Sequence, residues 1–399
     1  MDSYFASVEQ QFNQKLVGKP IGVIKAPGRT CVIAASRQAK KFGVKTGTNV
    51  WDARVLCPQI ILVPANFDRY FGVTKKFIQI CENFSPYLEV FSIDELFMDV
   101  TESQKFFGGV KNMCLQIKKQ IKEQVGEYVT CTIGISYNRL LAKLASEMNK
   151  PDGLFEITPE NRDKVLFSAK LTDICGLGFR LEKRLLGMGI KDFKTLREIP
   201  MEFLQASFGP FWSVHLKRLS HGEDDSNLTG LEELQDTKSI SRTFTLFENT
   251  SDRQKIKQTL RNLCEEVGYK LRKMDTETRQ IGIMVRGDEQ GGHSHKTLKY
   301  YTDDSGEIFH FVWDEFNQLN WQNNVRFLGV WAGLLSRKAN LSLSIFPEVG
   351  RKEKLWQAVD KINDKFGGFT LYPAVLLGGE LIRPEVNGYL GDKKYQFGV

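Results

Sequence analysis

The chain has 399 residues, which at roughly 150 residues per domain predicts two to four domains, each able to bury its own core. Hydrophobic residues make up 41% and charged residues 26%, and this balance excludes a disordered, collagen-like or coiled-coil chain. Lys and Arg number 55 against 48 Asp and Glu, so the net charge of +7 is compatible with a polyanionic partner without proving one.

The seven cysteines are widely scattered and never arranged as Cys-x-x-Cys, which argues against a disulfide framework and against a zinc site. We therefore expect a cytoplasmic protein. The longest apolar stretches, such as 328–335, are far shorter than the roughly 20 residues that cross a bilayer, and the N-terminus has no signal-peptide pattern. Neither secretion nor membrane insertion is expected.

Residues 1–158 alternate between helical and strand-like patterns, which is typical of an α+β sheet domain. A helix begins near Tyr4, and Asp2 or Ser3 is suited to cap it. The further predicted elements, in chain order, are short strand-like segments within 19–64, a helix at 70–84, two β-rich runs on either side of Asp94-Glu95, a helix at 105–124, a buried strand from 129 and a helix at 138–150.

From about 159 to 227 the pattern is wholly helical and includes the turn Gly176-Leu177-Gly178. Residues 228–238 carry little periodicity and are expected to form a tether. A second, smaller α+β unit follows, with a strand at 239–247, a long helix, three more strands and a helix near 304–319. The long helix carries cations around its apolar side: Lys255, Lys257, Arg261, Lys270, Arg272 and Lys273.

The adjacent acids Asp94 and Glu95 are the first candidate site. Two carboxylates at the tip of a hairpin offer oxygen ligands of the kind that Mg²⁺ prefers. Acids are also common at tight turns because water solvates them there, and on spacing alone that interpretation stays open. Asp2 is a candidate third acid, although a helix cap is the simpler interpretation of its position.

Two further features suit phosphate groups. The glycines of Gly176-Leu177-Gly178 leave backbone N–H groups exposed, and the helix that follows adds positive potential at its start. A set of cations could grip a triphosphate: Arg37, Lys40, Lys41, Lys143 and Lys150. A plain turn between helices and solvated surface lysines would give the same patterns, so both interpretations remain.

Four motifs occur together: MDSYFASVEQ at the start, then FSIDELFMDVT, TIGISYNRLLAKLASEMNKPDG and ICGLGFRLEKRLLGMGI. In this order and at these separations they resemble the Y-family DNA polymerases, the bacterial DNA polymerase IV and UmuC-like group. The resemblance extends over nearly the whole chain and is strongest within residues 1–200. It implies a multidomain α+β fold shaped like a right hand.

In that family a palm of mixed sheet and helices carries the active site, and small fingers cover the base pair. A helical thumb with a helix-hairpin-helix grips DNA, and an α+β little finger adds a DNA-binding domain. The resemblance distributes these parts along the chain as palm 1–11 and 67–158, fingers 12–66, thumb 159–227, tether 228–238, little finger 239–346 and a C-terminal extension 347–399.

The resemblance also implies roles for individual residues. Asp94 and Glu95, with the carbonyl of Met1, match the ligands of two Mg²⁺ ions that serve nucleotidyl transfer. Phe5 matches the steric gate that excludes a 2′ hydroxyl, and it also packs as the apolar side of its helix. The residues matched to nucleotide binding are Ser3, Tyr4, Phe5, Arg37, Lys40 and Lys150, and those matched to DNA binding are Gly176 and Gly178.

The chain departs from the family pattern at two places. The family has a metal-binding aspartate, on a strand, directly before the position of Met1, so we expect the natural chain to begin upstream. The family's fingers also carry Thr, Tyr and Arg on one helix face, where this chain has Ala34, Arg37 and Lys40. Positive charge persists there, whereas the hydroxyl groups are lost.

The implied partners are primer–template DNA and deoxynucleoside triphosphates. The glycine turn and the basic helix and strands of the little finger would hold the DNA backbone without reading sequence, so binding should weaken steeply with salt. Residues 340–346 loosely resemble a peptide that binds a sliding clamp, although an apolar strand fits them as well. Residues 347–399 resemble the extension of UmuC-like members.

The resemblance implies an enzyme, a low-fidelity DNA-directed DNA polymerase acting in translesion synthesis, DNA repair and the SOS response. One alternative keeps the fold without the chemistry: a catalytically impaired or truncated DNA-binding member that lacks the first metal aspartate. A more distant alternative is a nucleotide cyclase built on a related palm. The glycine turn and the basic C-terminal domain argue against the cyclase.

Overall fold

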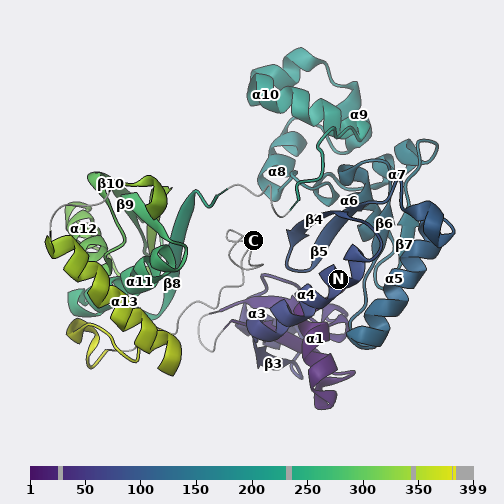
Figure 1. The fold of residues 1–399 in the computed structure, drawn as a ribbon. Helices are drawn as coiled ribbons and strands as arrows, with labels where there is room; N and C mark the ends of the chain where they lie inside the picture. Colours follow the sequence, from purple (N-terminus) through teal and green to yellow (C-terminus); the bar gives the residue numbers. More distant parts are fainter. Residues whose placement is uncertain (26–29, 231–235, 343–346, 380, 383–399) are drawn as a thin grey trace. The chain divides into compact units, whose positions relative to one another are not determined.

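The computed structural model describes residues 1–25, 30–230, 236–342, 347–379 and 381–382. The chain divides into two compact units, Met1–Leu234 and Gln235–Val399, and each mixes helices with strands (Figure 1). Within the described ranges, every helix is too short or too polar to span a bilayer.

A small sheet follows the first helix of the N-terminal unit. Strand β1 (Ile21–Ile24) runs antiparallel to β2 (Val32–Ala35) and parallel to β3 (Ile61–Pro64). The short helices nearby are η1 (Gln14–Leu16), α2 (Arg37–Lys40) and α3 (Val50–Leu56). Ala34 lies in β2, so the prediction that it shares a helix face with Arg37 and Lys40 is wrong. The buried run 32–35 favours a strand, and α2 begins only after Ser36, whose side chain caps it.

Two helices and a hairpin carry the acidic motif. Helices α1 (Tyr4–Phe12) and α4 (Phe67–Glu82) share one buried cluster, because the apolar residues of α4 recur every three or four positions. Strands β4 (Tyr87–Ser92) and β5 (Glu95–Asp99) form the predicted antiparallel hairpin. The turn consists of Ile93 and Asp94, and Glu95 is the first residue of β5, paired with Ser92.

The strand predicted from residue 129 is shorter than expected. Strand β6 comprises only Ile133–Ile135 and pairs in parallel with β7 (Leu154–Glu156), in a sheet separate from the hairpin. The preceding segment pairs with the start of the chain instead, since the Asp2 amide donates to the Thr130 carbonyl at 2.9 Å. The mixed sheet expected within 67–158 is therefore present as two separate pairs of strands.

Helices complete this region. The helix predicted at 105–124 is divided by two glycines of positive φ into η2 (Gln104–Phe107) and α5 (Val110–Gln124). Helix α6 (Arg139–Met148) begins at Asn138, whose side chain accepts a hydrogen bond from the Leu141 amide at 2.9 Å. Gly134 allows α6 to lie directly on β6, because a Cβ there would come within 2.1 Å of the Ala142 carbonyl oxygen.

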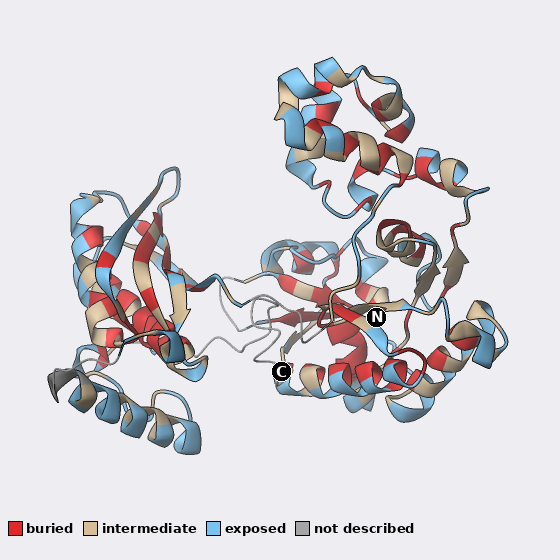
Figure 2. Cartoon of the chain, turned by 45° about the horizontal axis from the view of Figure 1, so that its top comes forward, coloured by how far each residue is buried: buried red, intermediate tan, exposed pale blue. Residues whose placement is uncertain are grey.

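The next part of the N-terminal unit is helical, as predicted, and has buried residues of its own (Figure 2). Its elements are α7 (Arg162–Ser168), η3 (Leu171–Asp173), α8 (Phe179–Gly187), α9 (Phe193–Glu198) and α10 (Met201–His221). Helix α10 is interrupted at Gly209, where φ is 76°, and Pro210 follows. The turn Gly176-Leu177-Gly178 connects η3 with α8.

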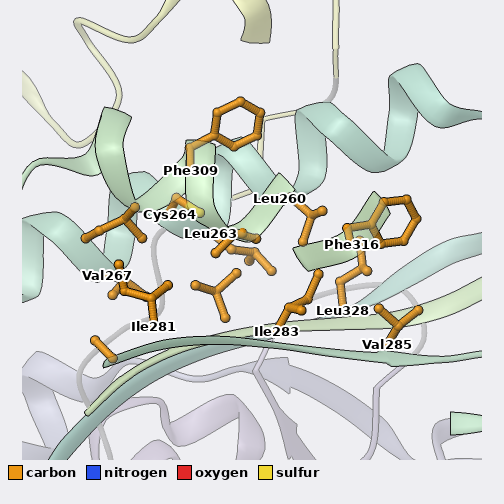
Figure 3. Close-up of a cluster of buried hydrophobic side chains, with 14 of the residues drawn as sticks. Leu260, Leu263, Cys264, Val267, Ile281, Ile283, Val285, Phe309, Phe316 and Leu328 are labelled. Atoms are coloured by element: carbon orange, nitrogen blue, oxygen red, sulfur yellow. The ribbon is translucent and has the colours of Figure 1, made fainter. Parts of the chain in front are cut away.

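The C-terminal unit is an antiparallel sheet in the order β10-β9-β11-β8, with two helices packed on it. Its elements are β8 (Ser239–Thr250), α11 (Arg253–Lys273), β9 (Thr276–Arg286), β10 (Gly291–Thr302), α12 (Ser305–Gln318) and β11 (Val325–Arg337). Figure 3 shows Leu263 and Phe316 from the helices facing Ile281 and Ile283 from the sheet. Each element predicted for 239–337 is confirmed.

The tail continues with η5 (Lys338–Asn340), α13 (Pro347–Phe366) and η6 (Ala374–Leu376). Helix α13 bonds to α11 through the pairs Arg272–Asp360 and Lys273–Asp364, both at 2.6 Å. Arg261 pairs with Glu265 of its own helix, also at 2.6 Å. These three α11 cations are thus neutralised within the unit, which differs from the expectation that the basic helix follows DNA. Residues 343–346, most of the predicted clamp-binding peptide, lie outside the described residues.

Candidate active site

Hydrogen bonds fasten the turn of the β4-β5 hairpin to α1 and α4. The Met1 nitrogen donates to the Asp94 carbonyl at 2.7 Å. The hydroxyls of Tyr4 and Thr74 are hydrogen-bonded at 2.8 Å, and Thr74 donates to the Ile93 carbonyl at 2.6 Å. Burial, and to a smaller extent the charge of Asp94, raises the pKa of Tyr4. The first residues of α1 and the acidic turn therefore form one local structure.

The carboxylates of Asp94 and Glu95 are each bonded through one oxygen. The Ser92 hydroxyl donates to Oδ1 of Asp94 at 2.7 Å, and the Lys143 ammonium pairs with Oε1 of Glu95. The second oxygen of each carboxylate has no hydrogen-bond or ion-pair partner within the described residues, and both side chains are partly exposed. Two oxygens at this turn are thus available to a hard cation.

In the part of the chain that the structure describes, no three His, Cys, Asp or Glu side chains are grouped as a metal site. The turn thus offers two carboxylates among the described residues, and their combined charge balances one divalent cation.

A chain of ion pairs runs from the hairpin along α6. Lys143 pairs with Glu95 and, at 3.3 Å, with Glu147, which in turn pairs with Lys150 at 2.7 Å. Burial opposes ionisation of Glu147, but its hydrogen bond with Lys150 and the charges of both lysines outweigh it and lower the pKa of that carboxyl. Lys150 is therefore held near the acidic turn by a charged neighbour.

Asp2 does not cap α1, and the capping prediction is wrong. Its carboxylate is 4% exposed and accepts hydrogen bonds of 2.8 Å from Thr130, Thr132 and the Asp152 amide. Burial disfavours the charged form, yet these donors prevail and hold the pKa of Asp2 below its ordinary value. Ser3, at the cap position, has a left-handed backbone with φ 47° and makes no capping hydrogen bond through its side chain.

Arg37 and Lys40, from α2, lie near the same group. The Arg37 guanidinium donates to the Thr130 hydroxyl and lies 3.8 Å from the Asp2 carboxylate. Partial burial and the charges of Lys150 and Arg37 lower the pKa of Lys40, although Asp2 opposes this. Since the Lys40 side chain is exposed, we regard the repulsion between cations as the informative cause. The charges of Lys150 and Arg37 near Lys40 favour a polyanionic ligand.

Phe5 packs against aromatic side chains of α4. Its ring is stacked on the ring of Tyr70, with centroids 4.4 Å apart and planes at 15°. Phe67 meets both rings edge-on at 5.6 Å. Phe5 is 8% exposed, so most of its surface is covered and only a small part remains open to a ligand.

The glycine turn has an open surface. Gly176 has a φ of +97°, Gly178 precedes the first turn of α8, and a Cβ added at either would meet no atom within 4 Å. Leu177 between them is 2% exposed and anchors the turn. A cavity of about 500 Å³ lies between this part and the hairpin, and its lining includes Phe97, Lys143, Cys175, His215 and Arg218.

Comparison with known proteins identifies the family. Residues 1–147 match the model of the impB/mucB/samB family, and 237–345 match the model of that family's C-terminal domain. The DNA polymerase IV of Pelotomaculum thermopropionicum is 34% identical over 94% of each chain, and that of Desulfatibacillum aliphaticivorans is 32% identical over 94% of this chain and 95% of its own. The Y-family DNA polymerase chimera Dbh-Dpo4(243-245)-Dbh matches with a TM-score of 0.73 and 26% identity, over 84% of this chain and 97% of the chimera. The chain belongs to the Y family of DNA polymerases.

A second solved Y-family structure, described as an insertion ternary complex of Dbh DNA polymerase, matches at 25% identity with a TM-score of 0.53, over 83% of this chain and 96% of its own. In this Y-family chain, hydrogen bonds join Met1 directly, and Tyr4 through Thr74, to the turn that holds Asp94. The pKa of Lys40 is lowered by its burial and by the charges of Lys150 and Arg37, which both act on it.

Several residues of the site are missed by sequence reasoning. Ser92, Thr130 and Thr132 bond to acids of the site, and Tyr70 lies against Phe5. Apart from Ser92, they are distant in the sequence from the residues they contact, so no local pattern reveals them. Glu147 is different, because it follows Lys143 by four positions and precedes Lys150 by three, which is a detectable spacing for helical ion pairs.

Proposed function

We propose that this Y-family protein is a DNA-directed DNA polymerase that copies damaged as well as intact template, with low fidelity, in DNA repair and the SOS response. The observation that carries the proposal is the acidic turn. Within the described residues, Asp94 and Glu95 each have an oxygen without a partner, and the turn is bonded to Met1. The DNA polymerase IV relatives and the ternary complex support the same activity.

We assign the parts of the polymerase hand accordingly. Residues 1–11 and 67–158 form the palm, with 12–66 as fingers and 159–227 as the thumb. Residues 228–238 serve as a tether, 239–346 as the little finger, and 347–399 as a C-terminal extension. The helix-hairpin-helix of the thumb is η3, the glycine turn and α8.

Y-family DNA polymerases depend on divalent metal ions. The donor set fits such an ion in kind, since both free oxygens belong to carboxylates, the ligands that Mg²⁺ prefers. We propose that Asp94, Glu95 and the Met1 carbonyl hold two Mg²⁺ ions together with the triphosphate. Bound Mg²⁺ would supply Lewis-acid stabilisation of the primer 3′ oxygen and of charge on the reacting phosphate. The protein itself orients the carboxylates, that of Asp94 by a hydrogen bond from Ser92 and that of Glu95 by an ion pair with Lys143.

The nucleotide site uses charge and shape. Arg37, Lys40 and Lys150 neutralise the triphosphate, and the backbone N–H groups of Ser3, Tyr4 and Phe5 face it at the start of α1. The Phe5 ring occupies the volume that a ribose 2′ hydroxyl would need, which selects deoxynucleotides. The repulsion that lowers the pKa of Lys40 supports the first of these roles, because a bound polyanion relieves it.

The further partner is primer–template DNA. The N–H groups around Gly176 and Gly178 bind a backbone phosphate, and the little finger adds contacts that do not depend on sequence. A sliding clamp is a candidate partner through 340–346. We place the protein in the cytoplasm on the pattern of its seven cysteines, which are scattered along the sequence.

Primer extension by the full chain tests this function. A labelled primer is annealed to an intact template and to one with an abasic site, then incubated with Mg²⁺ and deoxynucleoside triphosphates. We expect template-directed addition on both, with frequent misincorporation. A chain that binds the duplex but adds no nucleotide with Mg²⁺ or Mn²⁺ would instead be a catalytically impaired DNA-binding protein, since two carboxylates are then too few.

A further inference from the structure

The ring of Phe5 is supported from behind by α4. Tyr70 lies parallel to it at 4.4 Å, and Phe67, one helical turn earlier, meets it edge-on at 5.6 Å. Tyr70 has no exposed surface and Phe67 is 2% exposed. Protein interiors are close-packed, so the Phe5 ring has no free volume on the side where Phe67 and Tyr70 pack against it.

Tyr70 is itself fixed at both ends. Its hydroxyl donates to Oε1 of Glu9 at 2.8 Å, and its carbonyl accepts a hydrogen bond from the Tyr4 hydroxyl at 2.8 Å. Glu9 is 4% exposed, and its Oε2 accepts from Arg69 at 2.8 Å. Burial and the hydrogen bond to Glu9 raise the pKa of Tyr70, so its hydroxyl remains a donor throughout the physiological pH range.

We propose that Tyr70, anchored by Glu9, is a positioning residue that sets the sugar selectivity of the polymerase by holding the Phe5 ring in place. The inference rests on the proposed function of Phe5 as the steric gate. A gate excludes a 2′ hydroxyl only if it resists displacement. The 2′ hydroxyl of a bound ribonucleotide would press against the Phe5 ring. The stacked Tyr70 resists this displacement, because it is buried and hydrogen-bonded to the buried Glu9.

The test compares deoxynucleotide with ribonucleotide insertion by the full chain. The readout is the ratio of kcat/KM for dATP to kcat/KM for ATP opposite template dT, from one preparation of each variant. Both rates are divided by the same concentration of folded enzyme, so a variant that is merely less stable leaves the ratio unchanged. Tyr70→Leu should lower the ratio about three- to tenfold, as expected for the loss of one aromatic contact.

Tyr70→Phe keeps the ring and removes only its bond to Glu9, so its ratio should fall by less than that of Tyr70→Leu. Phe77→Leu is the matched control, since Phe77 is 3% exposed and lies two turns further along α4. It should lower stability and leave the ratio at the wild-type value. Phe5→Ala should lower the ratio more than any Tyr70 variant.

The outcomes separate the two proposals. A ratio that collapses in Phe5→Ala but stays at the wild-type value in Tyr70→Leu would overturn the positioning role and leave the proposed function intact. An unchanged ratio in Phe5→Ala would overturn the gate and the inference with it. Equal losses in Tyr70→Leu and Phe77→Leu would show that any core defect suffices, which also contradicts the inference.

Discussion

Replacing Asp2 by alanine should lower the free energy of unfolding by about 3 to 5 kcal/mol, the usual cost of leaving the buried partners of a lost charge unpaired. Three donors lie 2.8 Å from its carboxylate oxygens, and the residue is 4% exposed. Each hydrogen bond to a charged group contributes roughly 1.5 to 3 kcal/mol, but the carboxylate regains its hydration on unfolding, which offsets part of the total.

Asp2→Asn should cost less, about 1 to 3 kcal/mol, because the Thr130 and Thr132 hydroxyls can reverse their hydrogen bonds whereas the Asp152 amide cannot. Urea unfolding monitored by circular dichroism measures both variants. The folded state lowers the pKa of Asp2 from its ordinary value of 3.8. Its stabilising contribution is therefore complete above that value and disappears as the pH falls through the lowered pKa.

Glu102→Ala is the control for the loss of a carboxylate, since the Glu102 side chain is 81% exposed and, among the described residues, pairs with Lys105 alone. It should change the free energy of unfolding by less than about 0.5 kcal/mol. A loss for Asp2→Ala as small as that of the control would refute the reasoning. So would a difference between wild type and Asp2→Asn that grows on acidification.

Three further substitutions test the proposed ligand-binding surfaces. Lys40→Ala should raise the KM for deoxynucleoside triphosphates about tenfold, because one charge-assisted contact is lost, and it should change stability little. An unchanged KM in steady-state kinetics would exclude that contact. Gly176→Ala should cost about 1 to 2 kcal/mol of stability, because its φ of +97° strains any residue with a Cβ. A Cβ added at Gly178 would meet no atom within 4 Å, so Gly178→Ala should leave stability unchanged. It should weaken affinity for a DNA duplex, measured by fluorescence anisotropy titration. Equal affinity of wild type and Gly178→Ala would show that the turn is not part of the DNA interface.

Local patterns predict much of the fold. The hairpin at Asp94, the helix α6 and all the elements of 239–337 follow from periodicity and turn residues, which act over a few positions. The position of Asp94 in the hairpin turn follows for the same reason. Glu95 is displaced by one position from the predicted turn, since a two-residue turn suffices to join the strands.

The remaining features depend on contacts between distant segments. Asp2 has the sequence context of a helix cap, but its partners lie about 130 to 150 positions away and are brought to it only by the fold. The strand predicted from 129 begins only at Ile133, because Thr130 bonds with the start of the chain instead. Tyr70 is an ordinary apolar position of α4, and only the packing of α1 on α4 shows that it supports Phe5.

The central claim is that carboxylates at the hairpin turn carry nucleotidyl transfer. Single-turnover incorporation of one nucleotide, with DNA and triphosphate saturating, tests it most directly. Asp94→Ala should reduce the rate constant by about a thousandfold or more, since metal-assisted charge stabilisation contributes several kcal/mol. Asp99→Ala, at the exposed far end of β5, should retain the wild-type rate. A rate for Asp94→Ala within tenfold of that of Asp99→Ala would contradict the account.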